Sequence, residues 1–189
     1  MSIYQPAEDS YFLSDILKSH IPKLLSQNPD LKFLEIGTGS GVQLQTAENS
    51  GVKKENIFSV DINPDAVKHC SLLGYNCIHS DLFEAFGGKL NIKENFPLQF
   101  DLIIFNPPYL PEHEYDKEKD TSGGKNGDET ILRFLKNAKS FLKPNGKIFL
   151  LLSSRTPMEN ILNEFENYKK RFLGTERLFY EDLSIWELS

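Results

Sequence analysis

The sequence predicts an α/β fold, in which helices cover both faces of a doubly wound, mostly parallel sheet of seven strands. One reason is the apolar run at residues 100–105, which is typical of a strand buried on both faces and stops at Asn106-Pro107-Pro108-Tyr109. Another is the stretch at residues 32–49, where a short apolar run, a glycine loop and a helical pattern follow one another. Strand and helix patterns then alternate to the C-terminus.

The sequence begins with a helical lead-in over residues 1–30, in which we expect a helix at residues 8–19. Four apolar residues at helical spacing would face the sheet: Phe12, Leu13, Ile16 and Leu17. Before them, the polar segment at residues 4–10 reads Tyr-Gln-Pro-Ala-Glu-Asp-Ser. It is richer in hydrogen-bonding groups than an N-cap requires, but from the residues alone helix capping explains it best.

Glycines at alternating positions follow the first strand: Gly37, Gly39 and Gly41. Such a loop allows a ligand to approach the backbone, and the next helix, at residues 42–49, offers unpaired N–H groups to an anion. The pattern lacks the final spacing of the dinucleotide fingerprint Gly-x-Gly-x-x-Gly. By itself, the glycine pattern is therefore a moderately specific signal of a ligand site.

An acidic residue ends the second expected strand, at residues 57–62. Asp61 lies 24 residues after Gly37, where mononucleotide-binding βαβ units carry the acid that takes the ribose hydroxyls. Asn63 and Pro64 already supply the cap and first turn of the next helix. A ligand role for Asp61 is therefore favoured over a capping role.

A third, short strand at residues 75–79 ends in Ser80-Asp81-Leu82. Asp81 would accept a hydrogen bond from an adenine amino group. A surface loop is the alternative for Asp81 taken alone, but acids placed after successive strands favour the ligand role.

The segment Asn106-Pro107-Pro108-Tyr109 is stiff and extended, because each proline fixes its own φ and restricts the residue before it. It presents two acceptors, the amide oxygen of Asn106 and the backbone C=O of Pro107, beside the ring of Tyr109. These acceptors suit the two hydrogens of a planar NH₂ group, whose nitrogen would then be aimed for attack. The alternative is an ordinary strand-ending turn.

Residues 111–127 form a long polar loop beside this segment, which is either a substrate loop or a disordered insertion. A helix follows from Asp128, with apolar residues at helical spacing: Ile131, Leu135, Ala138 and Leu142.

Later elements complete the sheet. We expect a turn at residues 144–146, a strand at 147–153 and a capping box at 156–159 that opens a helix to about Tyr168. The charged run 169–171 would be a solvated helix end. Two short strands close the sheet, near residues 172–175 and 183–188.

The protein has 189 residues, of which 39% are hydrophobic and 25% charged, which suits a single globular domain over residues 1–189. There is no secretion signal and no apolar window near about 18 residues, so we expect a cytoplasmic protein with no membrane contact. The net charge of −6 favours a protein or small-molecule substrate over nucleic acid.

Only two cysteines occur, Cys70 and Cys77, and in a reducing compartment we expect buried thiols rather than a disulfide. His69 and His79 flank them, but the spacing matches no zinc module, so no metal site is expected.

The glycine loop, Asp61, Asp81 and the Asn-Pro-Pro-Tyr segment together resemble class I S-adenosylmethionine-dependent methyltransferases, whose Rossmann-like sheet has an antiparallel last strand. The polar segment 4–10 and the run Gly-Gly-Lys-Asn-Gly at 123–127 further resemble the HemK/PrmC family of release-factor glutamine methyltransferases, in its short archaeal and eukaryotic form. The resemblance covers residues 4–188. The separate N-terminal helical domain of the bacterial members is missing.

The resemblance implies that S-adenosylmethionine is the cofactor and that the acceptor is the N5 nitrogen of a glutamine in a peptide-chain release factor. The cofactor residues that it implies are Ser10, Glu35, Gly37, Gly39, Gly41, Asp61, Asp81, Leu82 and Asn106. The catalytic residues that it implies are Asn106, Pro107 and Tyr109. The substrate side would consist of Asn106, Pro107, Pro108, Tyr109 and Leu110.

Other functions fit parts of the pattern. The same segment would hold the exocyclic amine of a flipped base, as in an N6-adenine or N2-guanine methyltransferase, although the acidic charge argues against it. A non-catalytic cofactor-binding scaffold or a nicotinamide-dependent dehydrogenase would use the glycine loop but would not need an amine clamp.

In the family's usual sheet order, the strand Tyr75 to His79 lies at an edge, with unpaired N–H and C=O groups. It contains no proline, and Tyr75, Cys77 and Ile78 make it less polar than an edge left in water. The resemblance implies a small zinc-binding activator protein over this region, which would add a strand to the sheet. The alternative is an edge covered by the protein's own residues 83–90.

Overall fold

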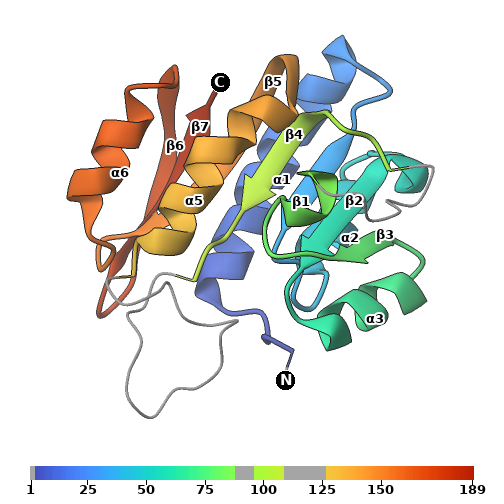
Figure 1. Ribbon diagram of the computed structural model, residues 1–189, viewed down its shortest axis with the longest axis horizontal. Helices are drawn as coiled ribbons and strands as arrows, with labels where there is room; N and C mark the ends of the chain where they lie inside the picture. Colours follow the sequence, from blue (N-terminus) through green and yellow to red (C-terminus); the bar gives the residue numbers. More distant parts are fainter. Residues whose placement is uncertain (1–2, 88–95, 109–126) are drawn as a thin grey trace.

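The computed structural model describes residues 3–87, 96–108 and 127–189, which contain a single seven-stranded sheet (Figure 1). Its order is β3-β2-β1-β4-β5-β7-β6. Five strands are parallel: β3 (Asn76–His79), β2 (Ile57–Asp61), β1 (Phe33–Ile36), β4 (Phe100–Phe105) and β5 (Leu142–Ser153). The last strand, β7 (Asp182–Leu188), runs antiparallel to both β5 and β6 (Lys170–Arg177), which confirms the predicted fold.

Helices cover both faces of the sheet. On one face lie α1 (Glu8–Gln27), α2 (Val42–Asn49) and α3 (Pro64–Leu72), and on the other lie α4 (Glu84–Gly87), α5 (Glu129–Ala138) and α6 (Met158–Phe165). Along β4, Leu102 and Ile104 face the first layer, and Ile103 and Phe105 face the second. From Leu102 to Phe105 the strand is entirely apolar, because both of its faces are buried there. Among the described residues, no helix has the length and apolarity needed to cross a membrane.

The chain adds its first strands on one side of β1 and its later strands on the other side. From β1 the sheet continues to β2 and β3 on one side, whereas β4 pairs with the other side of β1. Ile36 and Phe105 are register partners, so the glycine loop after β1 and Asn106 after β4 leave the sheet side by side. Such a change of side creates a crevice at the carboxyl ends of the strands, where α/β sheets of this type bind ligands.

The first helix is longer than the sequence indicates. It continues past Ser19 to Gln27 and contains Pro22. An internal proline disfavours a helix by about 3 kcal/mol. The apolar face nevertheless continues through the fully buried Ile21 and through Leu24 and Leu25, which pack on the same core, and this burial offsets the proline.

The segment between α5 and β5 also differs from the prediction. Leu142 is not part of the helix, which ends at Ala138, but is the first residue of β5. The expected turn at 144–146 lies inside β5 as a bulge, because the register with β4 jumps from Leu142 to Lys147 and Asn145 adopts a φ of 68°. An extended β4 partner on one side holds this irregular stretch in the sheet.

The predicted capping box at 156–159 is wrong. Pro157 is the N-cap of α6 and no side chain supplies a cap hydrogen bond there, and the hydroxyl of Thr156 is buried without a partner among the described residues. The charged run 169–171 is not a helix end either, since Lys170 and Arg171 begin β6. The Arg171 guanidinium donates to the Glu187 carboxylate at 2.6 Å across the β6–β7 pair, a contact that sequence spacing does not reveal.

Candidate functional site

The glycine loop after β1 has a backbone that side chains would strain. Gly37, Gly39 and Gly41 have φ values of +72°, +48° and +79°, a region that favours glycine. A Cβ atom at Gly41 would lie 2.9 Å from the Cys70 Sγ, too close for two such atoms. By contrast, a Cβ atom at Gly37 would lie 3.8 Å from the Phe105 ring, an ordinary van der Waals contact, and Gly37 itself is exposed.

Asp61 ends β2 and lies against the same loop. Its carboxylate accepts hydrogen bonds from the Gly39 N–H and the Asn63 N–H, both at 2.8 Å, and the residue is only 7% exposed. Asn63 itself caps α3 by accepting from the Asp65 N–H, as predicted. Asp61 therefore has a structural role in shaping the glycine loop that sequence reasoning had set aside. A carboxylate accepts hydrogen bonds at both of its oxygens, which is the chemistry that a ligand hydroxyl would require.

Glu35 lies beneath the loop on β1 and is 4% exposed. The Thr38 hydroxyl donates to it at 3.2 Å. Burial is the main factor that raises the pKa of Glu35 well above its ordinary value, and the neighbouring Cys70 and Asp61 add to the effect. A buried carboxyl of this kind favours a cationic ligand group, whose charge would stabilise the ionised form.

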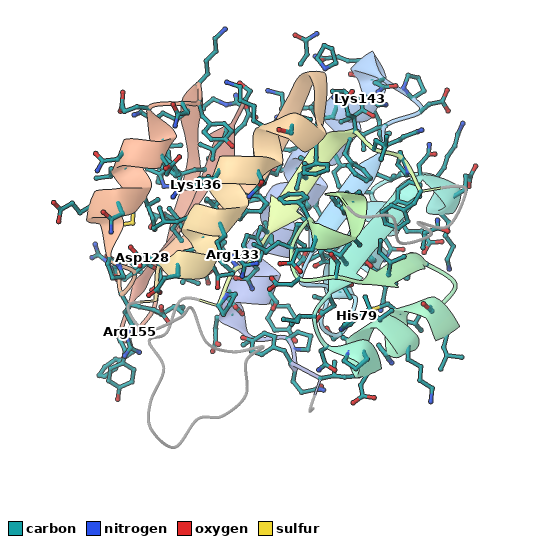
Figure 2. The ribbon with its side chains drawn as sticks, viewed as in Figure 1. His79, Asp128, Arg133, Lys136, Lys143 and Arg155 are labelled. Carbon is teal, nitrogen blue, oxygen red and sulfur yellow. The ribbon has the colours of Figure 1, made fainter. Side chains whose placement is uncertain are left out.

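On the predicted adenine side of the site, Asp81 and Leu82 have contacts and a backbone shape that the sequence did not indicate. Asp81 is not an isolated acceptor, because its carboxylate forms an ion pair at 3.0 Å with Arg133 on α5, which is labelled in Figure 2. Leu82 has a φ of 48°, unusual for a residue with a side chain. The Ser80 hydroxyl stabilises this backbone by donating to the Leu82 C=O at 2.9 Å and accepting from the Ala85 N–H at 3.0 Å.

Asn106 has one polar atom of its amide fixed and the other without a partner. Its Nδ2 donates to the Asp9 Oδ2 at 2.8 Å. A carboxylate only accepts hydrogen bonds, so this contact decides which end of the amide is the nitrogen. The Oδ1 atom is buried and has no hydrogen-bond partner among the described residues. Buried acceptors are rarely left unpaired, so this oxygen is a candidate ligand-binding atom.

The rest of the Asn-Pro-Pro-Tyr segment is described only in part. Pro107 is buried and Pro108 is partly buried, directly after Asn106. Tyr109, Leu110 and the predicted substrate loop at 111–127 lie outside the described residues, apart from Gly127.

The polar segment 4–10 belongs to the site and is not a helix cap. The N-cap of α1 is Ala7, where no side chain supplies a cap bond. Asp9 is 7% exposed and accepts from the Tyr4 hydroxyl at 3.1 Å, the Ser10 N–H at 2.6 Å and Asn106. Burial, and then Asp9, raises the pKa of Tyr4 above its ordinary value. Sequence reasoning missed Asp9; the surplus of polar groups before the helix was the signal that could have revealed it.

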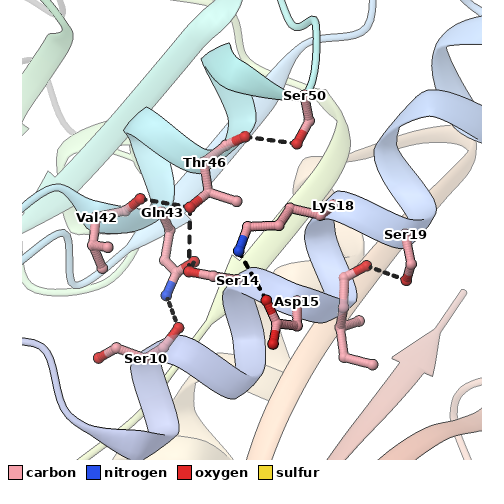
Figure 3. A network of polar contacts seen from close by, with 10 residues as sticks. Ser10, Ser14, Asp15, Lys18, Ser19, Val42, Gln43, Thr46 and Ser50 are labelled. Atoms are coloured by element: carbon pink, nitrogen blue, oxygen red, sulfur yellow. Dashed lines mark hydrogen bonds and ion pairs between the residues drawn. The ribbon is translucent and has the colours of Figure 1, made fainter.

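A polar network holds the start of α1 against α2 (Figure 3). The Gln43 Nε2 donates to the Ser10 C=O at 2.7 Å, and its Oε1 accepts from the Ser14 hydroxyl at 2.9 Å. The Thr46 hydroxyl donates to Ser14 in turn. Because α2 follows the glycine loop directly, this network sets Asp9 and Ser10 beside that loop and opposite Asn106.

The cysteines are buried rather than at the surface, and Cys70 lies under the glycine loop. Both Cys70 and Cys77 are free thiols and are buried. The Cys70 Sγ lies 3.7 Å from the Gly39 C=O, so α3 packs closely against the loop.

Comparison with known proteins gives a consistent result. Residues 12–173 match the family model of the methyltransferase small domain. The Methanocaldococcus jannaschii protein MJ0928, which carries a provisional name as a protein N5-glutamine methyltransferase, is 35% identical, over 98% of this chain and 92% of its own. The mouse protein named methyltransferase HEMK2 is 32% identical, over 93% of this chain and 82% of its own.

A solved structure agrees over the whole length of the protein. The Mtq2 subunit of the E. cuniculi Mtq2–Trm112 complex, described as responsible for methylation of the translation termination factor eRF1, has a TM-score of 0.70 and 25% identity. The match covers 100% of this chain and 99% of that one. This protein therefore belongs to the methyltransferase small domain family, among the HemK-type class I methyltransferases.

Proposed function

We propose that this enzyme transfers a methyl group to the N5 nitrogen of a glutamine side chain in a peptide-chain release factor. The observation that carries the proposal is the buried, unpaired Oδ1 of Asn106, fixed in orientation by Asp9. Such an oxygen suits the N–H of an amide or amine that enters the crevice. An enzyme that methylates a translation factor would act in the cytoplasm.

The methyl donor of this family is S-adenosylmethionine, which supplies an electrophilic methyl group on a sulfonium ion. The residues present fit it. Gly37 is exposed, so its backbone is accessible to a ligand, and the buried Glu35 carboxyl suits an ammonium group. The methionine portion would be held by Ser10, Glu35, Gly37, Gly39 and Gly41. Asp61 would take the ribose hydroxyls, and Asp81 and the Leu82 backbone would take the adenine, with Asp81 sharing its carboxylate between the base and Arg133.

On the acceptor side, the Asn106 Oδ1 and the Pro107 C=O would bind the two hydrogens of the glutamine NH₂. An amide nitrogen is a weak nucleophile because its lone pair is delocalised, so orientation and exclusion of water matter most. The Asp9 carboxylate accepts from the Asn106 amide and so makes its Oδ1 a stronger acceptor. Pro108, Tyr109 and Leu110 would shape the substrate side.

The relatives support this substrate. MJ0928 is named a protein N5-glutamine methyltransferase. A fission yeast relative, 27% identical to this protein, is named the eRF1 methyltransferase catalytic subunit mtq2. The solved Mtq2–Trm112 complex is likewise described as methylating eRF1. None of these descriptions names a nucleic acid.

The test is transfer of a labelled methyl group to a release factor, compared with RNA and DNA. Asn106→Ala should lower kcat about a hundredfold or more, by analogy with loss of one preorganised polar group. Replacing the acceptor glutamine in the release factor's Gly-Gly-Gln loop by alanine should abolish labelling. Labelling that persists at another atom, or that appears only on nucleic acid, would reject the proposed substrate.

We also propose a small, zinc-binding activator protein at the β3 edge. Within the described residues β3 pairs only with β2, and beside it a hollow of about 490 Å³ is lined by Lys54, Glu55, Phe58, Gly74 and Asn76. Leu72, at the end of α3, is 80% exposed. The presence of Trm112 beside Mtq2 in the similar structure supports a partner subunit here.

The prediction that Tyr75, Cys77 and Ile78 make this edge apolar has to be corrected. Tyr75 and Cys77 are buried against the core, at 6% and 2% exposure, so they do not make the edge apolar. The exposed leucine and the unpaired backbone carry the proposal instead. Ile78→Pro should abolish co-purification with the activator while leaving the helix content of the isolated protein nearly intact. A wild-type protein that is monomeric and fully active alone would contradict it.

A further inference from the structure

The tip of the β6–β7 hairpin, residues 178–181, exposes two aromatic side chains. Phe179 is 90% exposed and Tyr180 is 83% exposed, more than any other large apolar residue among those described. Their ring centroids lie 4.6 Å apart with the planes at 82°. Neither residue belongs to a core cluster. A paired, exposed aromatic patch contributes nothing to this core and is typical of a protein interaction site.

The tip is held firmly in place. Across its turn, the Leu178 N–H donates to the Glu181 C=O at 2.8 Å, and the Glu181 carboxylate accepts from the Ser153 hydroxyl at the end of β5. Asp182 and Ser154 exchange two hydrogen bonds, at 2.8 and 3.0 Å. The aromatic pair therefore sits on a preorganised support, which lowers the entropy lost on binding.

The tip lies at the same edge of the sheet as the candidate site. β5, to which it is fixed, pairs with β4, whose carboxyl end carries Asn106, and Figure 1 shows the β6–β7 turn at this end of the molecule. Strand β6 of the hairpin packs on α1, the helix that carries Asp9 in its first turn, since a Cβ atom at Gly174 would lie 3.5 Å from the Ile16 Cδ1 and 3.7 Å from the Phe12 ring. The hairpin and the helix that holds Asn106 through Asp9 are therefore neighbours.

We propose that Phe179 and Tyr180 form a docking contact for the protein substrate, outside the crevice that receives its glutamine. This inference rests on the proposed function. A folded protein that places one side chain at Asn106 must cover neighbouring surface at this edge, whereas a short peptide need not. The matching surface on the substrate is an apolar patch with a carboxylate nearby, because Arg155 is exposed beside the tip and makes no ion pair among the described residues (Figure 2).

The features of the tip favour a protein over a nucleic acid. Rings at 82° shield each other and do not offer two parallel faces for successive bases. The second arginine nearby, Arg177, is paired with Asp182, and the protein as a whole carries a net charge of −6. Backbone phosphates require several unpaired cations.

The test compares an intact release factor with a short synthetic peptide that contains the acceptor glutamine. The test variant is the full-length protein with Phe179→Ser and Tyr180→Ser, and the matched control is Leu162→Ser, a residue 50% exposed on α6. In the double variant, kcat/KM for the intact protein should fall about tenfold or more, as for interface aromatics. The peptide's kcat/KM and the affinity for S-adenosylmethionine should stay at wild-type values, and the control should behave as wild type.

Three results would overturn the inference. The double variant could keep wild-type kcat/KM on the intact protein, or lose activity equally on protein and peptide, which would indicate damage to the site itself. It could also lose crosslinking to RNA while protein methylation is unchanged, which would assign the tip to nucleic acid. A wild-type enzyme inactive on both protein and peptide would instead remove the proposed function, and this inference with it.

Discussion

The contact between Asp9 and Asn106 offers the sharpest test of how the site works. In Asp9→Asn, the new amide can present an NH₂ group toward the Asn106 Nδ2, and two donors repel each other. Asn106 would then rotate and turn its own nitrogen toward the substrate, so the acceptor is lost. The lost bond is partly buried, 2.8 Å long and made to a charged group. Such bonds contribute about 1.5–3 kcal/mol, which corresponds to roughly 10- to 150-fold in kcat.

The assay is steady-state methylation of the acceptor peptide, with S-adenosylmethionine affinity measured by calorimetry. The expected pattern is a lower kcat with cofactor affinity close to wild type. Glu8→Gln is the matched control, because Glu8 is exposed, lies next to Asp9 in the first turn of α1 and loses the same charge. If Asp9→Asn is folded and turns over at the wild-type rate, Asp9 does not orient Asn106.

Three further variants test the cofactor side. Asp61→Ala should weaken S-adenosylmethionine binding by about 1.5–3 kcal/mol, the scale for hydrogen bonds to a charged group; unchanged affinity in calorimetry would remove Asp61 from the ribose role. Gly41→Ala should lower the free energy of unfolding by about 1–3 kcal/mol, measured in urea, because it strains a φ of +79° and places a Cβ 2.9 Å from the Cys70 Sγ. Glu35 has a pKa raised above its ordinary 4.5, so without cofactor its contribution to stability is present below pH 4.5 and is lost as the pH rises through the folded-state pKa. Glu35→Gln should remove that part of the pH dependence and also weaken the cofactor; identical stability curves for variant and wild type would contradict this.

Much of the fold and part of the site followed from local chemistry. In the run Phe100–Phe105 all residues but Asp101 are apolar, because the strand is buried on both faces, and two prolines must end it, so strand and boundary are visible in the sequence. Asn63 before Pro64 marks a helix start in the same way. Asp61 ends β2 at the distance from the glycine loop at which mononucleotide-binding βαβ units carry an acid, so its place too is visible in the sequence.

The tertiary structure decided contacts between segments distant in the sequence. Asp9 and Asn106 are 97 residues apart, and nothing in either stretch shows that one orients the other. The ion pair between Asp81 and Arg133 depends in the same way on how α5 packs against the sheet. Helix α1 passes through Pro22 because burial against the core outweighs a local preference. Propensity and spacing act over a few residues, so they predict elements and loops, whereas the pairing of polar groups across the crevice depends on how those elements pack together.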